Sequence, residues 1–318
     1  MHRDGARMIA VGHDSWWDHR DRAPLRIGLA TIAALQWALE ASQLAWQIHD
    51  RAHYREGGAL AQTLARVPGA AWLLWALATV GLVQLARDRQ PVRAGAFALA
   101  CFALASAWQT QVFGSPSRNA FFPGAALLGW VLGQLWIGER PSAANRGLRE
   151  RMGEAGAIAC IAAAYVGSCT SKLMVGGLAW ADGDMLRALV IKQAPLAGWD
   201  WLVAIRDGIA GSPQLGQLLA IATLVIEGGA WVLLLGRGLR TAWALAIIGL
   251  HLSITLLCTM PYLEPIALLG LLALPWPRWL HREGADDDSG TVRPLPAASV
   301  LLAMIGIAWL LAPWGWRG

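Results

Sequence analysis

Charged side chains are scarce in this chain. Only 15% of its 318 residues are Asp, Glu, Lys or Arg, against roughly a quarter in a typical soluble domain. The four cysteines form no CxxC pair and have no Cys/His spacing that suits zinc. No segment alternates polar and apolar residues as a barrel strand does. These absences exclude an ordinary soluble domain, a zinc module and a transmembrane barrel.

Long apolar runs are what the chain does contain. Nine stretches approach the roughly 17 to 25 residues that a helix needs to cross a bilayer, and backbone groups in lipid must be satisfied within helices. We therefore predict an all-α polytopic transmembrane bundle of about nine spans. The predicted spans cover residues 25–46, 68–86, 93–112, 120–138, 154–172, 216–235, 241–259, 261–276 and 297–313.

The same pattern predicts how the chain is organised along its length. Residues 1–24 are polar and no cleavage site follows the first apolar run, so we expect a cytoplasmic segment and a retained first span. A single transmembrane domain is expected over residues 25–279. A cytoplasmic loop with a solvated acidic run, residues 286–288, follows at 280–296, and a final span with a short tail occupies 297–318.

Basic residues predict the orientation of the spans. With the N-terminus in the cytoplasm and the C-terminus outside, seventeen of the twenty-six Lys and Arg residues lie in inside segments and eight outside. Cytoplasmic loops carry such an excess. We therefore expect a multi-pass protein of the cell inner (plasma) membrane. Arginines facing anionic lipid account for the formal charge of +5, so the lipid bilayer is an expected partner and nucleic acid is not.

The longest outside loop and two packing features complete the expected architecture. The loop runs over residues 174–215 and includes a predicted short surface helix at 182–193. Gly129 and Gly133 form a GxxxG step that would let the fourth span pack closely. Cys169 and Cys258 lie near the outer ends of their spans, where they could form a disulfide in an oxidising compartment or pack as small buried thiols.

Ionisable side chains inside predicted spans indicate the functional site. Because such groups cost free energy in lipid unless they face a cavity or a partner, we predict that they line one outward-opening chamber. Four of them lie away from the inner ends of their spans, at the centre or in the outer half: Glu40, Lys172, Glu227 and His251. The spacing of His49 and His53 would suit a metal pair on a helix, but we read them as a solvated loop and predict no metal.

Structural alternatives remain open for each of these residues. Glu40 shares a helix face with Gln36 and Gln43, with which it could form a hydrogen-bonded packing network. Glu227 and His251 could satisfy one another as a buried pair. Lys172 is one of only two lysines in the chain, and its long side chain could extend to the outer headgroups.

At these positions the sequence resembles the vitamin K-dependent gamma-carboxylase-like family, also described as the horizontally transferred transmembrane domain. Lys172 and Leu173, followed by Trp180 and by Gly183 after Asp182, are similar to the lysine segment of that family. The resemblance implies that the lysine acts as a base on a reduced quinone. Further matches are an acidic residue in the next span, a histidine in the span after that and the arginine between them: Glu227, His251 and Arg240.

The resemblance extends over roughly residues 26–279 and shows two departures. The segment SRNAFFPGA, residues 117–125, is similar to one in which the animal carboxylase carries an Asn-His pair, but here Asn119 is followed by Ala120. The large C-terminal extracytoplasmic region of the animal enzyme has no counterpart. Both departures argue against gamma-glutamyl carboxylation itself, because fold transfers between relatives more readily than reaction.

The predicted chemistry follows from these residues together. A lysine has a pKa of about 10.4 in water, so a lysine base requires surroundings that favour its neutral form, such as the apolar neighbours Leu173, Met174 and Val175. We predict catalytic roles for Lys172, Glu227 and His251. Ligand-binding roles are expected for Asn119, Trp180, Glu40 and Asp182, with a quinol as cofactor and no metal.

Three functions are compatible with this reading. The first is a quinol- or lipid-dependent membrane enzyme that acts on an extracytoplasmic substrate such as a peptide. The second is a non-enzymatic binding, immunity or accessory membrane protein of the same fold. The third is a thiol–quinone redox partner, which requires Cys169 and Cys258 to approach within bonding geometry.

Overall fold

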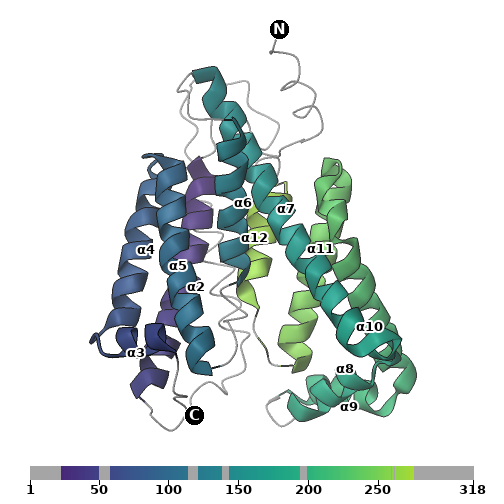
Figure 1. The fold of residues 1–318 in the computed structure, drawn as a ribbon. Helices are drawn as coiled ribbons and strands as arrows, with labels where there is room; N and C mark the ends of the chain where they lie inside the picture. Colours follow the sequence, from purple (N-terminus) through teal and green to yellow (C-terminus); the bar gives the residue numbers. More distant parts are fainter. Residues whose placement is uncertain are drawn as a thin grey trace. The chain divides into compact units, whose positions relative to one another are not determined.

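A computed structural model of the chain describes residues 23–49, 58–113, 121–137, 143–193, 199–258, 260 and 262–275. Every regular element in these ranges is a helix (Figure 1). The prediction of an all-α fold is therefore confirmed over the described residues, where eight of the nine predicted spans correspond to helices. The ninth predicted span, residues 297–313, lies outside them.

The chain divides into two compact units. The N-terminal unit, Trp17–Cys160, and the C-terminal unit, Ile161–Gly318 together with Met1–Trp16, share the long helix α7 (Ala143–Gly176), which passes from one to the other. The other helices of the N-terminal unit are α2 (Ala23–His49), α3 (Ala59–Ala65), α4 (Ala70–Ala86), α5 (Pro91–Phe113) and α6 (Phe121–Ile137).

The C-terminal unit alternates long helices with short ones. Two 3₁₀ segments, η3 and η5, each continue directly from the end of a long helix. After α7 come η3 (Gly177–Asp182), α8 (Asp184–Gln193), α9 (Asp200–Gly211), α10 (Pro213–Gly228), η5 (Gly229–Leu234), α11 (Arg237–Cys258) and α12 (Leu263–Ala273).

Four of the described helices are long and apolar enough to cross a membrane: Pro91–Gln111, Gly147–Asp182, Pro213–Leu234 and Arg237–Cys258. Three shorter apolar helices accompany them, of which α12 has only 11 residues and is about 17 Å long at 1.5 Å per residue. Helix α2 has 27 residues but carries Arg26, Glu40 and three glutamines. These features are those of a membrane protein.

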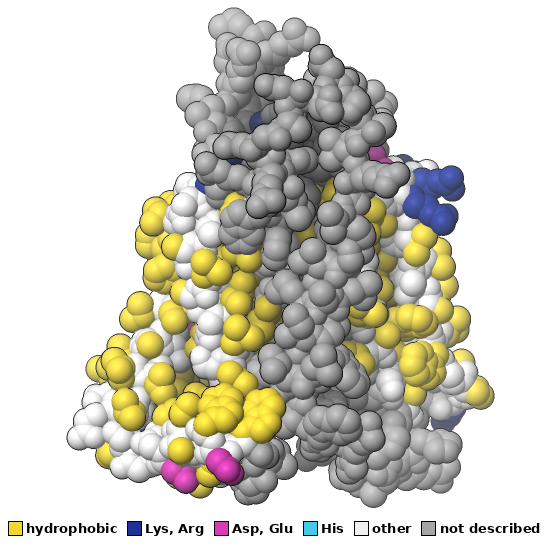
Figure 2. Space-filling view, turned by 180° about the vertical axis from the view of Figure 1, so that it is seen from behind, with side chains coloured by type: hydrophobic (Ala, Val, Ile, Leu, Met, Phe, Trp, Pro, Cys, Tyr) yellow, Lys and Arg dark blue, Asp and Glu magenta, His cyan; other side chains and the backbone are white. Residues whose placement is uncertain are grey.

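Helix α4 shows the side-chain arrangement expected of a helix in lipid. Its buried face consists largely of alanine, glycine and leucine, whereas Leu73, Val80 and Val83 are exposed. Small residues on the inner face allow close helix contact, and large apolar residues can face hydrocarbon without cost. Figure 2 shows hydrophobic side chains over much of the described surface, with charged groups in a few places only.

Aromatic side chains link the helices of the N-terminal unit by ring stacking and by a hydrogen bond. Helix α4 packs against both α2 and α5. The ring of Trp37 on α2 stacks on Phe102 of α5 with ring centroids 4.6 Å apart. The indole Nε1 of Trp75 on α4 donates a hydrogen bond of 3.0 Å to the carbonyl oxygen of Ala34 on α2.

The predicted GxxxG contact is confirmed between α6 and α7. A Cβ atom added to Gly129 would lie 2.0 Å from the carbonyl oxygen of Gly156, and one added to Gly133 would lie 1.9 Å from that of Met152. Both distances are far below any real Cβ contact. Glycine at these positions therefore lets the two backbones approach as closely as they do.

An ionic cluster joins α2 to the first half of α7. The guanidinium of Arg26 forms an ion pair with Glu150, and its other terminal nitrogen lies 4.0 Å from Asp88. Arg26 and Glu150 are both buried. Because the three charges are close together, removing one of them would leave an uncompensated buried charge.

The predicted outer loop is more ordered than the sequence indicated. The expected surface helix at 182–193 is confirmed as α8, with Asp184 in its first turn. A further helix, α9, was not predicted, although Leu202 and Ile209 give it a buried face. Both helices lie across the ends of α10 and α11 (Figure 1). Val190, Ile209 and Cys258 form the centre of the resulting apolar cluster.

Three arginines of this unit donate hydrogen bonds to backbone carbonyl groups near the ends of helices. Arg187 donates to the carbonyl oxygen of Ala210 at the end of α9, and Arg206 donates to that of Leu256 at the end of α11. Arg240 donates to that of Leu233 in η5. Cations at helix C-termini satisfy orphan carbonyl groups and interact favourably with the helix dipole. These arginines are therefore structural as well as contributing to the charge bias along the chain.

Candidate functional site

The polar face of α7 is the foundation of the candidate site. Tyr165, Ser168, Cys169 and Lys172 follow one another at helical spacing, so their side chains leave the same side of the helix. Because α7 continues to Gly176, Lys172 lies one turn inside the helix and not at its end as the predicted span of 154–172 implied. This places its side chain among the neighbouring helices.

Lys172 and Glu227 form an ion pair inside the C-terminal unit. The Nζ atom of Lys172 contacts both carboxylate oxygens of Glu227 and also donates to the hydroxyl of Ser168 at 3.1 Å. The side chain of Glu227 is 9% exposed and that of Lys172 is 24% exposed. The pair carries no net charge, which lowers the cost of holding two ionised groups in an apolar helix bundle.

Trp180 closes one side of this pair. Its ring centroid lies 5.2 Å from Lys172 Nζ, which is within the range of a cation–π interaction. The short 3₁₀ helix η3 presents this ring, and η3 packs against α10. Gly183, which follows η3 with a φ of +83°, makes this packing possible, because a Cβ atom there would lie 2.2 Å from the carbonyl carbon of Gly216.

The thiol of Cys169 on α7 lies at the contact between α7 and α10. Cys169 Sγ donates to the carbonyl oxygen of Leu224 at 3.4 Å. A Cβ atom on Gly228 would lie 3.1 Å from the same sulfur. Glu227 is the penultimate residue of α10, so this contact fixes its carboxylate opposite Lys172.

A second buried polar group lies on the same unit. The hydroxyl of Tyr165 and Nε2 of His251 are 2.6 Å apart. Tyr165 is 2% exposed and His251 is 6% exposed. The ring of Tyr262 packs on His251 with centroids 5.5 Å apart, and the carboxyl of Glu264 is buried in the first turn of α12. Either group can be the donor in this hydrogen bond, depending on the tautomer of the imidazole.

The two groups are close enough to interact electrostatically. The charge of Lys172 interacts electrostatically with His251, and the carboxylates of Glu227 and Glu264 interact in the same way with Tyr165. The three residues predicted to be catalytic, Lys172, Glu227 and His251, thus belong to one polar region of the C-terminal unit. The structure pairs Glu227 with Lys172 and His251 with Tyr165, rather than with each other. Lys172 turns to Glu227.

The four residues predicted to bind a ligand lie in four different places. Trp180 lies against Lys172. Asp182 is exposed at the end of η3. Asn119 lies outside the described residues. Glu40 belongs to the N-terminal unit, where Gln36 and Gln109 donate to its carboxylate.

Four residues of the site were missed by reasoning from the sequence: Ser168, Tyr165, Tyr262 and Glu264. A signal for each was present. Tyr165 and Ser168 lie seven and four residues before Lys172, on the same helical face. Glu264 is an ionisable residue within the predicted span 261–276, and two of the three tyrosines of the chain are Tyr165 and Tyr262.

The cysteines carry thiols and no disulfide. Cys169 packs between α7 and α10, whereas Cys258 lies in the apolar cluster of α8, α9 and α11. The hypothesis of a thiol–quinone redox partner would require a disulfide to form between Cys169 and Cys258. No group of three or more His, Cys, Asp or Glu residues within the described ranges could hold a metal ion.

Comparisons with protein-family models, curated proteins and solved structures find no match to this chain. The described residues themselves define a class: a helical protein with helices long and apolar enough to cross a membrane, and with a buried Lys–Glu pair beside a Tyr–His couple.

Proposed function

We propose that this chain is a multi-pass protein of the inner membrane, of the vitamin K-dependent gamma-carboxylase-like kind, whose Lys172 centre handles a lipid-soluble quinol. The observation that carries the proposal is the position of Lys172, held by Glu227 and Ser168 against the face of Trp180. An ionisable group at such a position is a functional candidate because placing it there costs free energy.

The residues at this centre suit a quinol. Trp180 presents an aromatic face, while the Lys172–Glu227 pair presents a nitrogen and two oxygens that can exchange hydrogen bonds. A bound quinol would supply two acidic hydroxyl groups on a ring that partitions into lipid. Lys172, Glu227 and Trp180 are the residues that would hold it.

The ion pair must change its protonation before Lys172 can act as a base. In that step the Nζ–H bond of Lys172 breaks, the proton passes to a carboxylate oxygen of Glu227, and a neutral amine and a neutral acid result. The contact between Nζ and both oxygens allows this transfer without movement of either helix. The amine then has a lone pair with which to accept a proton.

The proposal includes the nine-span arrangement with a cytoplasmic N-terminus and an external C-terminus. In that arrangement Lys172 lies toward the extracytoplasmic side. A peptide or lipid substrate would therefore approach from outside the cell.

The Lys172→Met variant tests the proposed function. Wild-type protein purified in lipid nanodiscs is expected to retain or bind menaquinone or ubiquinone, and Lys172→Met is expected to lose at least tenfold in quinone occupancy. Extraction followed by chromatography measures the occupancy. Lys192→Met is the matched control, because the other lysine of the chain is exposed on α8. Equal occupancy in wild type and a folded Lys172→Met protein would exclude the proposed role.

A second candidate function is a non-enzymatic binding protein, such as an immunity or accessory membrane protein. The Lys172–Glu227 pair favours this second function, because an ion pair can have a purely structural role, here that of holding α7 against α10. Wild-type protein that binds no quinone, yet protects cells against a peptide toxin, would support this function over the first.

A further inference from the structure

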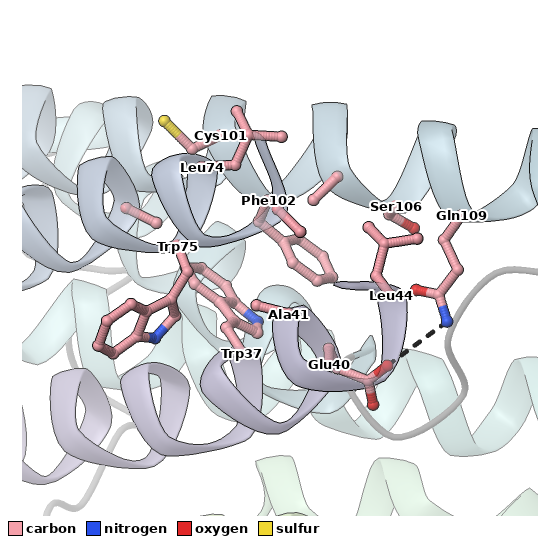
Figure 3. Close-up of a pocket in the computed structure, with 13 residues that line it drawn as sticks. Trp37, Glu40, Ala41, Leu44, Leu74, Trp75, Cys101, Phe102, Ser106 and Gln109 are labelled. Atoms are coloured by element: carbon pink, nitrogen blue, oxygen red, sulfur yellow. Dashed lines mark hydrogen bonds between the residues drawn. The ribbon is translucent and has the colours of Figure 1, made fainter. Parts of the chain in front are cut away.

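A small cavity lies within the N-terminal unit among α2, α4 and α5 (Figure 3). Its volume is about 30 Å³. Most of its wall is apolar, and its polar side chains are Glu40, Ser106 and Gln109, with the indoles of Trp37 and Trp75. No residue of the Lys172 centre takes part in it.

The indole of Trp37 requires an acceptor inside this cavity. Trp37 is 4% exposed, and its Nε1 has no hydrogen-bond partner among the described residues. Stacking on Phe102 holds the ring in place, so the N–H group cannot turn elsewhere. Trp75 lines the same cavity but donates to Ala34. Buried donors are rarely left unpaired, so we expect an acceptor oxygen beside Trp37 Nε1.

Glu40 has unused capacity as an acceptor. Gln36 Nε2 lies 3.3 Å from one carboxylate oxygen, and Gln109 Nε2 lies 3.5 Å from the other (dashed line in Figure 3). Both distances exceed the 2.9–3.0 Å typical of N–H···O hydrogen bonds. Since a carboxylate can accept about four hydrogen bonds, two long ones leave room for a further donor.

Water is the ligand that satisfies both groups. A water molecule needs roughly 10–15 Å³ of such volume and two to four polar partners, so the cavity has room for about two and none for a quinone ring. We propose that the cavity holds water between Trp37 and Glu40, and that Glu40 binds and releases a proton there. Water accepts from the indole N–H and donates to the carboxylate.

Among the described residues that line this cavity, Glu40 carries the only carboxyl group. From α4 the lining residues are Ala71, Leu74, Trp75 and Ala78, none of which titrates. From α5 the one titratable group is the thiol of Cys101, beside neutral Ser106 and Gln109. Helix α6, which also packs against α2, contributes none of the lining residues, and neither Lys, Arg nor His is among them.

The proton-uptake step balances with water alone. A hydronium ion in the cavity gives a proton to a Glu40 carboxylate oxygen, an O–H bond forms, and a water molecule remains. Release is the reverse. In the protonated form, the hydroxyl of the acid can donate to the water.

Infrared difference spectroscopy of the full chain in lipid nanodiscs tests this inference. As the pH is lowered, we expect a carbonyl band of a protonated carboxyl that disappears in Glu40→Gln, together with a band of a weakly bonded internal water. Trp37→Phe should abolish the water band and shift the carbonyl band. Trp72→Phe is the matched control, because Trp72 is exposed on α4 and does not line the cavity.

Two results would overturn the inference. One is superimposable wild-type and Glu40→Gln spectra across the pH range, and the other is a water band that survives in Trp37→Phe. If Trp37→Phe does not fold, Gln109→Met serves in its place, and an unchanged carbonyl band in that variant would count equally against the inference. Neither result depends on quinone binding at Lys172.

Discussion

At the scale of single residues, the Lys172–Glu227 pair shows how a membrane helix tolerates charge. Each group alone would be an uncompensated ion at an apolar helix contact, which costs several kcal/mol. Together they form a neutral unit whose remaining hydrogens reach Ser168 and the face of Trp180. The pair is therefore both a structural link between α7 and α10 and the chemical centre of the proposed function.

Replacing one partner of this pair should cost more than replacing both. We expect Glu227→Met to lower the free energy of unfolding by about 1–3 kcal/mol, below the 3–5 kcal/mol of fully buried pairs because Lys172 is 24% exposed. The double variant Lys172→Met with Glu227→Met should recover at least half of this loss. Reversible unfolding in bicelles measures both single variants, the double variant and the wild type. Additive single and double effects would show that the two charges are not coupled.

Residue identity singled out the ionisable side chains within the helices but did not predict their partners. Lys172, Glu227 and His251 could be selected because ionisable groups are rare in apolar runs. Their partners could not, since Glu227 lies 55 residues from Lys172 and Tyr165 lies 86 residues from His251. The tyrosine was overlooked because a phenol in an apolar helix is usual and carries no charge to attract notice.

At the scale of helices, the contact between α6 and α7 depends on the absence of side chains. The GxxxG step of α6 meets Met152 and Gly156 of α7 at backbone distance. In lipid no hydrophobic driving force holds helices together, so the close approach that glycine permits supplies the packing. Here the sequence motif correctly predicted a tertiary contact.

A methyl group should separate these two helices. We expect Gly129→Ala to lower the free energy of unfolding by about 1–3 kcal/mol through overpacking, because its Cβ would lie 2.0 Å from the carbonyl oxygen of Gly156. Gly167→Ala on α7 is the control, as nothing lies within 4 Å of its added Cβ, and alanine should stabilise the helix there by about 0.5–1 kcal/mol. Thermal or denaturant unfolding in detergent compares them. Equal effects of the two substitutions would refute the packing role of Gly129.

The short helices show where sequence patterns were insufficient. Helix α9 lies in a segment predicted as loop, and it contributes the buried Arg206 that donates to Leu256 at the end of α11. A buried arginine contradicts the usual pattern of an amphipathic surface helix. Only the neighbouring helix terminus, with its free carbonyl groups, explains that position.

At the scale of the whole molecule, the prediction of an all-helical fold is confirmed over the described residues, whose helices are compatible with a membrane protein. Four described helices are long and apolar enough to cross a bilayer, and others are shorter. The number of nine spans, the domain boundaries and the orientation of the termini stay predictions. These predictions rest on hydropathy and on the distribution of arginine along the chain. Two of the arginines, Arg206 and Arg240, also have a structural role, because they donate to carbonyl groups near helix ends.

Cysteine labelling can test the orientation. In a background with the four native cysteines replaced by alanine, we expect Gly211→Cys to react with an impermeant maleimide in intact cells and Gly236→Cys to react only in inverted vesicles. Both positions are exposed and lie between helices or at a helix end. The physical reason is the excess of arginine in the predicted cytoplasmic segments. Reaction of both from the same side would refute the arrangement.

The sequence by itself determined that the chain is helical and apolar and which few ionisable residues it carries within its helices, because hydropathy and helical periodicity are local properties. Tertiary structure alone decided that Lys172 pairs with Glu227 and Tyr165 with His251, and that Glu40 and Trp37 border a cavity of their own. Contacts between residues far apart in the chain depend on how helices pack, and packing depends on the shapes of many side chains at once.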